Sequence, residues 1–539
     1  MKGNEKHSRG FLSLVWQSAI KDYDGILTTS AVPRSLGWFL ICSLSIVVAL
    51  LVNLSVSMRI PIFTFPLWCL VTFIVLSKTI KVFYLDCCLG APSKDQPQFS
   101  WRFVSILFIM YVMLLCINGY SASTDVEGQW AQAQQGKFTD WHPFFHSMFF
   151  WMIQQVWDSK VFACIIQIML FVLVVGWIEV TLRRYAILRW IRILIIILVA
   201  FSPVMLSIGM RTLTKDSLFA IAVVSLMAAL FQIAWSEGRW LESWWHKFLF
   251  SFLILCVSYL RHNGIFITIP ILLLFFFMVF TTNRVKVGHY IVTWLLSVAL
   301  FLGYFCGRNL LIEKGVIGNN AGQKYVEAIG VPIAIIGEVM ISNPNSLDQE
   351  TRRFCERLCP LRDWKMYFRG DGNSIKPYLD FDYLQREVPP REFARHLWHI
   401  VKASPKDAYK AAKHITSIAW DPFPLAKFWR TPSKGNILRT SDCFAVCDLV
   451  LHPPVGWMFG APGFALLLLM ISGVVSWLKF GVGRAMPHLA LIAYLLGTGL
   501  LMYDSGISDF RFYWAIELAY PIVILGSCQK NENTDCGNA

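Results

Sequence analysis

The sequence predicts an all-α, polytopic membrane protein with about twelve transmembrane helices and a small, mainly helical outer domain. Apolar residues make up 56% of the 539-residue chain and charged residues only 15%, and the mean hydropathy is +0.53. This composition excludes an ordinary water-soluble enzyme. The apolar residues also come in blocks of about twenty, the length that crosses a hydrocarbon core of roughly 30 Å.

The first 35 residues are mostly polar, and they predict a cytoplasmic segment instead of a cleavable signal peptide. Within them, the apolar stretch 11–20 is too short to cross a bilayer. It could form a short helix that lies in the membrane interface.

Nine spans are expected in 36–306 and three in 457–527. The block 144–157 is apolar but shorter than a span, so we expect a helix in the interface; if it crosses the membrane, the topology changes. The predicted spans are 36–57, 62–82, 103–120, 161–182, 190–209, 217–235, 247–260, 264–282, 290–306, 457–478, 488–503 and 512–527.

Basic residues in short loops predict the orientation, because cytoplasmic loops carry an excess of Lys and Arg. With the N-terminus inside, the inner segments carry 20 basic residues and the short outer segments carry 7. Both ends, 1–35 and 528–539, are therefore expected in the cytoplasm. Many basic residues lie at span ends, so the net charge of +14 does not indicate a nucleic-acid partner.

The long polar segment 307–456 is expected on the outer side as a periplasmic, mainly helical domain. It contains two pairs of cysteines with i,i+4 spacing, which are Cys355 with Cys359 and Cys443 with Cys447. An oxidising compartment favours disulfides for these four residues. A zinc site and free thiols are the alternatives.

Ionisable residues gather at the outer side of the predicted topology, while the span interiors contain almost none. A transporter usually needs polar groups near the midplane and often has repeated halves. Charge at one interface is instead typical of an enzyme whose lipid-linked substrate has its head group at that depth.

The outer loop 121–160 begins with Asp125 and Glu127, directly after a span. Two carboxylates at this spacing could supply a general base and a second base, or could bind a divalent metal, Mg²⁺ or Mn²⁺. The alternative is a pair of solvated loop acids. In the same loop, Asp140 and His142 could line a polar head-group site, or could simply precede a helix that begins near Pro143.

Two cations, Arg211 and Lys215, lie at the outer start of the sixth span. Thr214 is the expected N-cap, and Asp216 in the first turn favours the helix dipole. A helix N-terminus with two nearby cations is a good phosphate site.

Further outer cations lie in two other turns. Arg261 and His262 precede an Asn-Gly pair between the seventh and eighth spans. Their side chains could snorkel to the interface, or could bind the same phosphate as Arg211 and Lys215. Arg511, at the start of the last span, could pair with Asp509 or reach a phosphate.

With these residues, the chain resembles the polytopic glycosyltransferases of the GT-C superfamily. The shared features are the acidic pair Asp125 and Glu127, the D-x-H-P element at 140–143, LTKD at 213–216, RHNG at 261–264, DFRF at 509–512 and a late outer domain. Two features depart from the superfamily. LTKD lacks the Trp of the WKD-like segment that similar bacterial proteins carry, and the acidic loop follows the third span, whereas in many members it follows the first. Either two extra spans precede the core, or Asp125 is not the equivalent residue.

The resemblance implies a hexosyltransferase of a bacterial inner membrane, which transfers a sugar from a polyprenyl-phosphate donor to a glycan or lipid acceptor. Asp125 would be the general base, and Glu127 its helper or a metal ligand. The implied phosphate-binding residues are Arg211, Lys215, Arg261 and Arg511. The expected partners are the donor, the acceptor and the lipid bilayer.

Two other functions remain open. An O-antigen-type polymerase or ligase also has about twelve spans and a large late outer loop, and it relies on outer Arg and His. A polysaccharide or lipid flippase would need a polar central cavity.

We predict that a reporter enzyme active only in the cytoplasm works when fused at Ser93 and Ala186, and fails at Lys376. This follows from the bias of 20 to 7 basic residues. Activity at Lys376 would place 307–456 inside and would remove the basis for an outer site.

Overall fold

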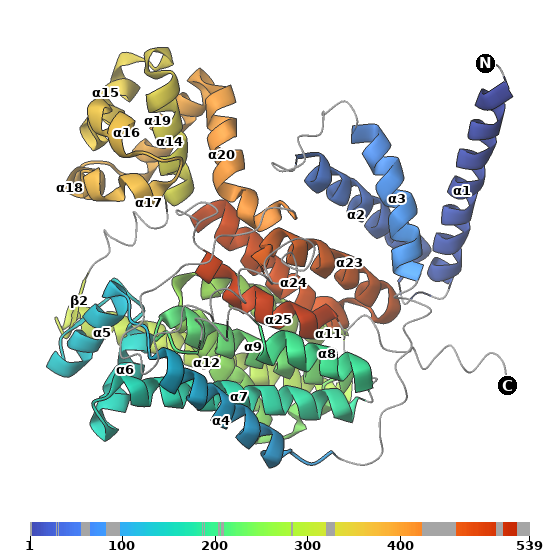
Figure 1. Cartoon of the computed structure of the whole chain (residues 1–539), viewed down its shortest axis with the longest axis horizontal. Helices are drawn as coiled ribbons and strands as arrows, with labels where there is room; N and C mark the ends of the chain where they lie inside the picture. Colours follow the sequence, from blue (N-terminus) through green and yellow to red (C-terminus); the bar gives the residue numbers. More distant parts are fainter. Residues whose placement is uncertain are drawn as a thin grey trace.

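The structure, a computed structural model, is almost entirely helical (Figure 1). Its strands, β1 (Phe138–Thr139) and β2 (Ile317–Gly318), are two residues long and pair in parallel. The all-α prediction is therefore confirmed. The described residues are 3–28, 30, 32–54, 65–81, 97–185, 187, 189–202, 205, 210–281, 284–319, 329–422, 460–502 and 510–524.

Six helices in these ranges are long and apolar enough to cross a membrane. Each coincides with a predicted span, and their length and composition are compatible with a membrane protein. They are α2 (Arg34–Leu54), α4 (Trp101–Asn118), α7 (Lys160–Arg184), α9 (Lys215–Trp235), α12 (Arg284–Glu313) and α23 (Pro462–Phe480).

The other six predicted spans each contain a shorter apolar helix. A helix of twelve residues is only about 18 Å long, so a count of twelve crossings remains a prediction. These shorter helices are α3 (Phe65–Lys81), α8 (Arg189–Ala200), α10 (Trp244–Leu260), α11 (Ile265–Thr281), α24 (Val482–Gly497) and α25 (Trp514–Ile524).

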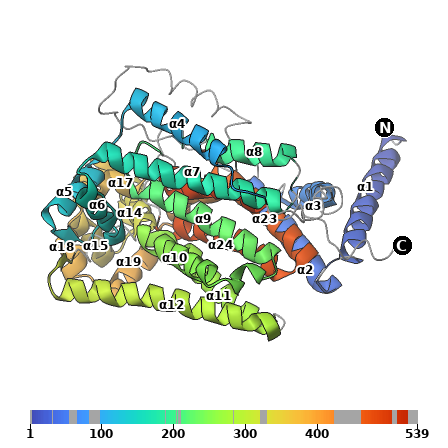
Figure 2. The same cartoon turned by 90° about the horizontal axis from the view of Figure 1, so that it is seen from below.

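Helix α9 lies at the centre of the bundle, where α7, α10, α24 and α25 surround it (Figure 2). Its apolar stretch is 94% buried, which is typical of a helix that is apolar on every face. Small side chains, among them Ala220, Ala228 and Ala229, allow neighbouring helices to approach closely.

One end of the bundle is covered by the loop 121–160. Its helices α5 (Thr124–Gln135) and α6 (Phe144–Val156) pack against each other, and β1 pairs with β2 beside them (Figure 1). Helix α6 has 13 residues, and its place in the membrane interface stays a prediction. The hydroxyl of Ser123 caps α5 by accepting a hydrogen bond from the Val126 amide.

The segment after α12 forms a group of small helices near the same end of the bundle (Figure 1). Helix α12 continues to Glu313, whereas the span was expected to end at 306. Apolar α14 packs against α16, α17, α19 and α20. Helix α20 in turn packs against α23. The helices are α14 (Gly330–Ser342), α15 (Gln349–Leu358), α16 (Leu361–Tyr367), α17 (Gly372–Ile375), α18 (Phe381–Arg386), α19 (Pro390–Ala403) and α20 (Pro405–Trp420), with 3₁₀ turns η6 (Pro344–Ser346) and η7 (Lys376–Tyr378).

The cysteines of this group differ from expectation. The thiols of Cys355 and Cys359 are both free and buried, so the structure does not form the disulfides expected for them. Burial raises the pKa of the Cys355 thiol to about 12, which keeps it protonated and unreactive. Cys443 and Cys447 lie outside the described residues.

The N-terminal segment forms a longer helix than the short interfacial one expected at 11–20. Helix α1 (Gly3–Thr28) packs against α3, and the Tyr23 hydroxyl donates a hydrogen bond of 2.8 Å to the Phe73 carbonyl. Apolar residues of α1, α2 and α3 form a cluster with α23, at the end of the bundle away from α5 and α6 (Figure 1).

The turn η5 (His262–Gly264) between α10 and α11 requires a glycine for space. A Cβ on Gly264 would lie 1.8 Å from the carbonyl oxygen of Val257 and 3.2 Å from the Phe219 ring. Gly264 is not among the residues with positive φ, so the reason is the close approach of two backbones.

We expect Gly264→Ala to destabilise the protein by about 1–3 kcal/mol or more, because the methyl group must displace backbone. Thermal unfolding of the purified protein in lipid nanodiscs measures this loss. Gly303→Ala is the matched control, since a Cβ there has nothing within 4 Å. Equal midpoints for the two variants would contradict the prediction.

Candidate functional site

Two segments far apart in the sequence are joined at the covered end of the bundle. Ser121 forms a parallel bridge with Thr212, and its amide donates to the Arg211 carbonyl at 2.8 Å. The Gln167 side chain donates to the Thr212 carbonyl at 3.1 Å, so buried irregular backbone finds a partner inside the bundle. These bonds bring the first turns of α5 and α9 close together.

Three predicted residues from α5, the following loop and α9 meet here. The Lys215 ammonium lies 3.0 Å from Nδ1 of His142, and Nε2 of His142 lies 3.8 Å from a carboxylate oxygen of Asp125. Because an ammonium only donates, Nδ1 must accept, so Nε2 carries the proton that faces Asp125. The Trp141 ring stacks on the imidazole at 4.8 Å. The Asp125 side chain remains 35% exposed, which leaves it accessible to a substrate.

The neighbouring residue Asp216 forms a buried ion pair with Arg261. Their side chains are only 1% and 6% exposed, and the guanidinium lies 4.2 Å from the centre of the Phe512 ring. Arg261, expected as a phosphate-binding residue, is therefore engaged by a carboxylate. Thr214 occupies the N-cap position of α9, but its hydroxyl makes no capping hydrogen bond.

The turn after Arg261 makes further contacts. Nε2 of His262 lies 3.3 Å from the Trp141 carbonyl, which places this predicted residue next to the His142 loop. The Asn263 amide donates to the hydroxyls of Tyr494 and Thr498, both at 3.1 Å. The turn thus joins α10 and α11 to α24.

Asp140 is paired with a cation that the sequence did not single out. Its carboxylate lies 3.5 Å from the Arg308 guanidinium, and its amide donates to the Gly318 carbonyl at 2.9 Å. The Arg308 side chain is 20% exposed, more than that of Arg261. An arginine at the predicted outer end of α12 was a usable signal, because outer ends of spans are usually poor in cations.

His146 lies four residues after His142, in the first turn of α6, and is fully buried. Its Nδ1 lies 3.1 Å from the Gln129 side-chain oxygen, and the Gln129 amide donates to the Ser147 hydroxyl. Burial, followed by the charge of Lys215, lowers the pKa of His146 to about 3. His146 is therefore neutral, and it holds α6 against α5.

Glu127 and Asp125 have different partners in the structure. Residues two apart on a helix face different directions, and Glu127 forms an ion pair with Lys160, which lies 5.8 Å from the centre of the Trp130 ring. Within the described residues, no group of three or more His, Cys, Asp or Glu side chains could hold a metal ion. A shared Mg²⁺ or Mn²⁺ site at the acidic pair stays a prediction.

Two further expected phosphate-binding residues differ in their placement. The Arg211 side chain is buried and donates to the Asn118 carbonyl at 3.4 Å, so it supports the backbone beneath the site. Arg511 belongs to the turn η10 (Phe510–Tyr513), but its side chain is not described. Asp509 lies outside the described residues.

One protein family, described as a family of unknown function (DUF6020), matches residues 130–412. No curated protein and no solved structure matches the chain. The matched region is more than half of the 539 residues and includes His142, Lys215, Arg261 and Arg308. The chain belongs to DUF6020, a family of unknown function.

Proposed function

We propose that this chain is a membrane glycosyltransferase similar to the GT-C superfamily, which transfers a sugar from a polyprenyl-phosphate donor to a glycan or lipid acceptor. One observation carries the proposal. The partly exposed carboxylate of Asp125 lies beside the His142–Lys215 pair and the N-terminus of the central helix α9. In this proposal the chain has twelve spans, its termini are cytoplasmic, and the site faces the outer side of a bacterial inner membrane.

The reaction needs one base and one anion-binding group. The acceptor hydroxyl attacks C1 of the sugar, a C1–O bond to the acceptor forms, and the C1–O bond to phosphate breaks. The electron pair leaves with the polyprenyl phosphate, and Asp125 accepts the hydroxyl proton. Nδ1 of His142 accepts from Lys215, and its Nε2 lies 3.8 Å from the Asp125 carboxylate, beyond hydrogen-bond distance.

The leaving phosphate would bind at the start of α9. Lys215 is the first residue of that helix, where the helix dipole favours an anion. Arg308 supplies a second cation: it pairs with Asp140 at 3.5 Å, but its side chain is 20% exposed, more than that of Arg261. Arg511 remains a candidate. Arg211 and Arg261 become supporting residues, because a carbonyl and a carboxylate already engage them.

The packing of the bundle favours an enzyme over a flippase. A flippase needs a polar path through the centre, whereas α9 fills the centre with apolar and small side chains. The O-antigen-type polymerase or ligase remains the alternative reading, and it would not depend on the Asp125 carboxylate.

We expect Asp125→Asn to lower turnover by about 10² or more, because the amide cannot accept the hydroxyl proton. Donor affinity should be retained. The assay uses the purified protein in nanodiscs with polyprenyl-phosphate sugars extracted from the source cells. Glu127→Gln is the matched control and should keep turnover within a few-fold, since Glu127 pairs with Lys160. Wild-type turnover of Asp125→Asn would favour the polymerase or ligase.

We expect Lys215→Ala to weaken donor binding by roughly 1.5–3 kcal/mol, the size of a charge-assisted contact to phosphate. Lys215→Arg should retain much of the affinity. Lys137→Ala, which removes an exposed lysine from the same loop region, should bind the donor normally. If Lys215→Ala lowers turnover but leaves donor affinity intact, Lys215 acts through His142 and does not bind the phosphate.

A further inference from the structure

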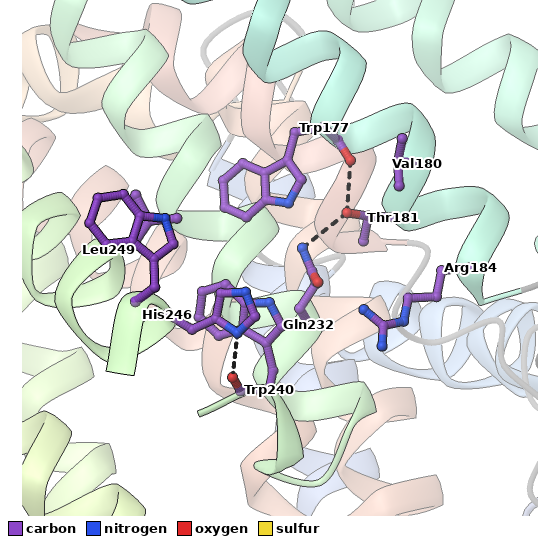
Figure 3. Close-up of a pocket in the computed structure, with 9 residues that line it drawn as sticks. Trp177, Val180, Thr181, Arg184, Gln232, Trp240, His246 and Leu249 are labelled. Atoms are coloured by element: carbon purple, nitrogen blue, oxygen red, sulfur yellow. Dashed lines mark hydrogen bonds between the residues drawn. The ribbon is translucent and has the colours of Figure 1, made fainter. Parts of the chain in front are cut away.

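A pocket lies at the opposite end of the helices that carry the candidate site. Gln232 lines it, seventeen residues along α9 from Lys215. At a rise of about 1.5 Å per residue, this places the pocket roughly 25 Å from the candidate site. Its volume is about 260 Å³. The lining residues are Trp177, Val180, Thr181, Arg184, Gln232, Trp240, Trp245, His246 and Leu249 (Figure 3).

Aromatic rings form the inner wall of this pocket (Figure 3). His246 stacks on Trp240 with 4.3 Å between ring centres, and Trp177 lies 6.4 Å from Trp240 at a small interplanar angle. Nδ1 of His246 lies 2.7 Å from the Trp240 carbonyl, so Nδ1 donates, and Nε2 of the neutral ring is left as an acceptor. The wall is thus mainly aromatic, with one imidazole nitrogen that can accept a hydrogen bond from a hydroxyl.

The polar side of the pocket is formed by a short hydrogen-bonded chain and a cation (Figure 3). The Gln232 amide donates to the Thr181 hydroxyl at 3.1 Å, and that hydroxyl donates to the Trp177 carbonyl at 2.8 Å. Arg184 lies beside them with an exposed side chain. None of the nine lining residues is acidic, so the charge of the pocket favours an anion.

Other cations reinforce this preference. Burial raises the pKa of the Tyr185 hydroxyl, and the positive charges of Arg184, Arg239 and Arg484 act in the opposite direction. The Tyr185 hydroxyl itself lies 3.4 Å from the Gln232 carbonyl, beside the pocket. Three cations from three different segments therefore gather around one end of the bundle, where the positive-inside rule predicts the cytoplasmic leaflet.

The rim of the pocket is suited to a membrane surface. Trp244 and Trp245, at the start of α10, are each 69% exposed. Exposed tryptophans at the end of an apolar helix are typical of the aromatic belt at the depth of lipid head groups. A ligand that reaches this pocket from the bilayer would therefore present its head group to Arg184 and its glycerol and chains to the tryptophan rings.

We propose that this pocket binds the phosphate head group of an anionic membrane lipid. Arg184 binds the phosphate, Nε2 of His246 accepts a hydrogen bond from a head-group hydroxyl, and the tryptophans hold the apolar part of the lipid. This inference does not depend on sugar transfer at the other end of the bundle.

The test is a lipid titration of the purified full-length protein in detergent, followed by native mass spectrometry. The probes are phosphatidylglycerol, zwitterionic phosphatidylcholine and soluble glycerol 1-phosphate. We expect phosphatidylglycerol to bind best, and Arg184→Gln to weaken its binding at least about tenfold, the factor that corresponds to one charge-assisted contact. The matched control Arg189→Gln removes an exposed charge at the same end and should bind within about twofold of wild type.

Thermal unfolding gives a second readout. Phosphatidylglycerol should raise the midpoint of the wild type and of Arg189→Gln, but not that of Arg184→Gln. Equal phosphatidylglycerol binding by both variants would overturn the proposal. Competition by glycerol 1-phosphate at the same concentration would also overturn it, because the pocket would then recognise a free phosphate ester and not a lipid.

Discussion

The buried ion pair between Asp216 and Arg261 holds together the end of the bundle on which the candidate site is built. It joins the first turn of the central helix α9 to the turn between α10 and α11, and the guanidinium also packs on Phe512 beside α25. Removal of one partner from such a pair leaves an uncompensated buried charge, which costs about 3–5 kcal/mol. The geometry of this end therefore depends on both residues being present.

The pair also determines what its neighbours can do. Consecutive residues of an α-helix point about 100° apart, so Asp216 faces Arg261 while Lys215 faces His142. One supplies the anchor, and the other supplies a cation near the surface. The Arg261 pair is buried, whereas Arg308, which pairs with Asp140, has a side chain that is 20% exposed. In the proposed function, this division separates structural from binding charges within a single helical turn.

The same three helices, α7, α9 and α10, connect two chemically different ends. One end gathers carboxylates, imidazoles and ammonium groups under α5 and α6, and the other gathers arginines and tryptophans around a pocket. Between them the helices are apolar and tightly packed, and α9 is buried almost throughout. A ligand at one end would therefore have no polar path to the other, and coupling between the ends would have to pass through the helices themselves.

By itself, the sequence determined the helical class, the position of most apolar helices and several of the polar residues that meet at one end, including Asp125, His142 and Lys215. Hydropathy and charge bias are read along the chain, so they report depth relative to the membrane.

Only the tertiary structure decided which side chains become partners. Glu127 forms an ion pair with Lys160, Arg261 with Asp216, and Asp140 with Arg308. The glycine of the RHNG turn is necessary because the Val257 carbonyl approaches it closely. These pairings depend on how each helix is rotated about its axis and on which helices it packs against. Rotation and packing arise from contacts between segments far apart in the chain, about which local periodicity and composition carry little information.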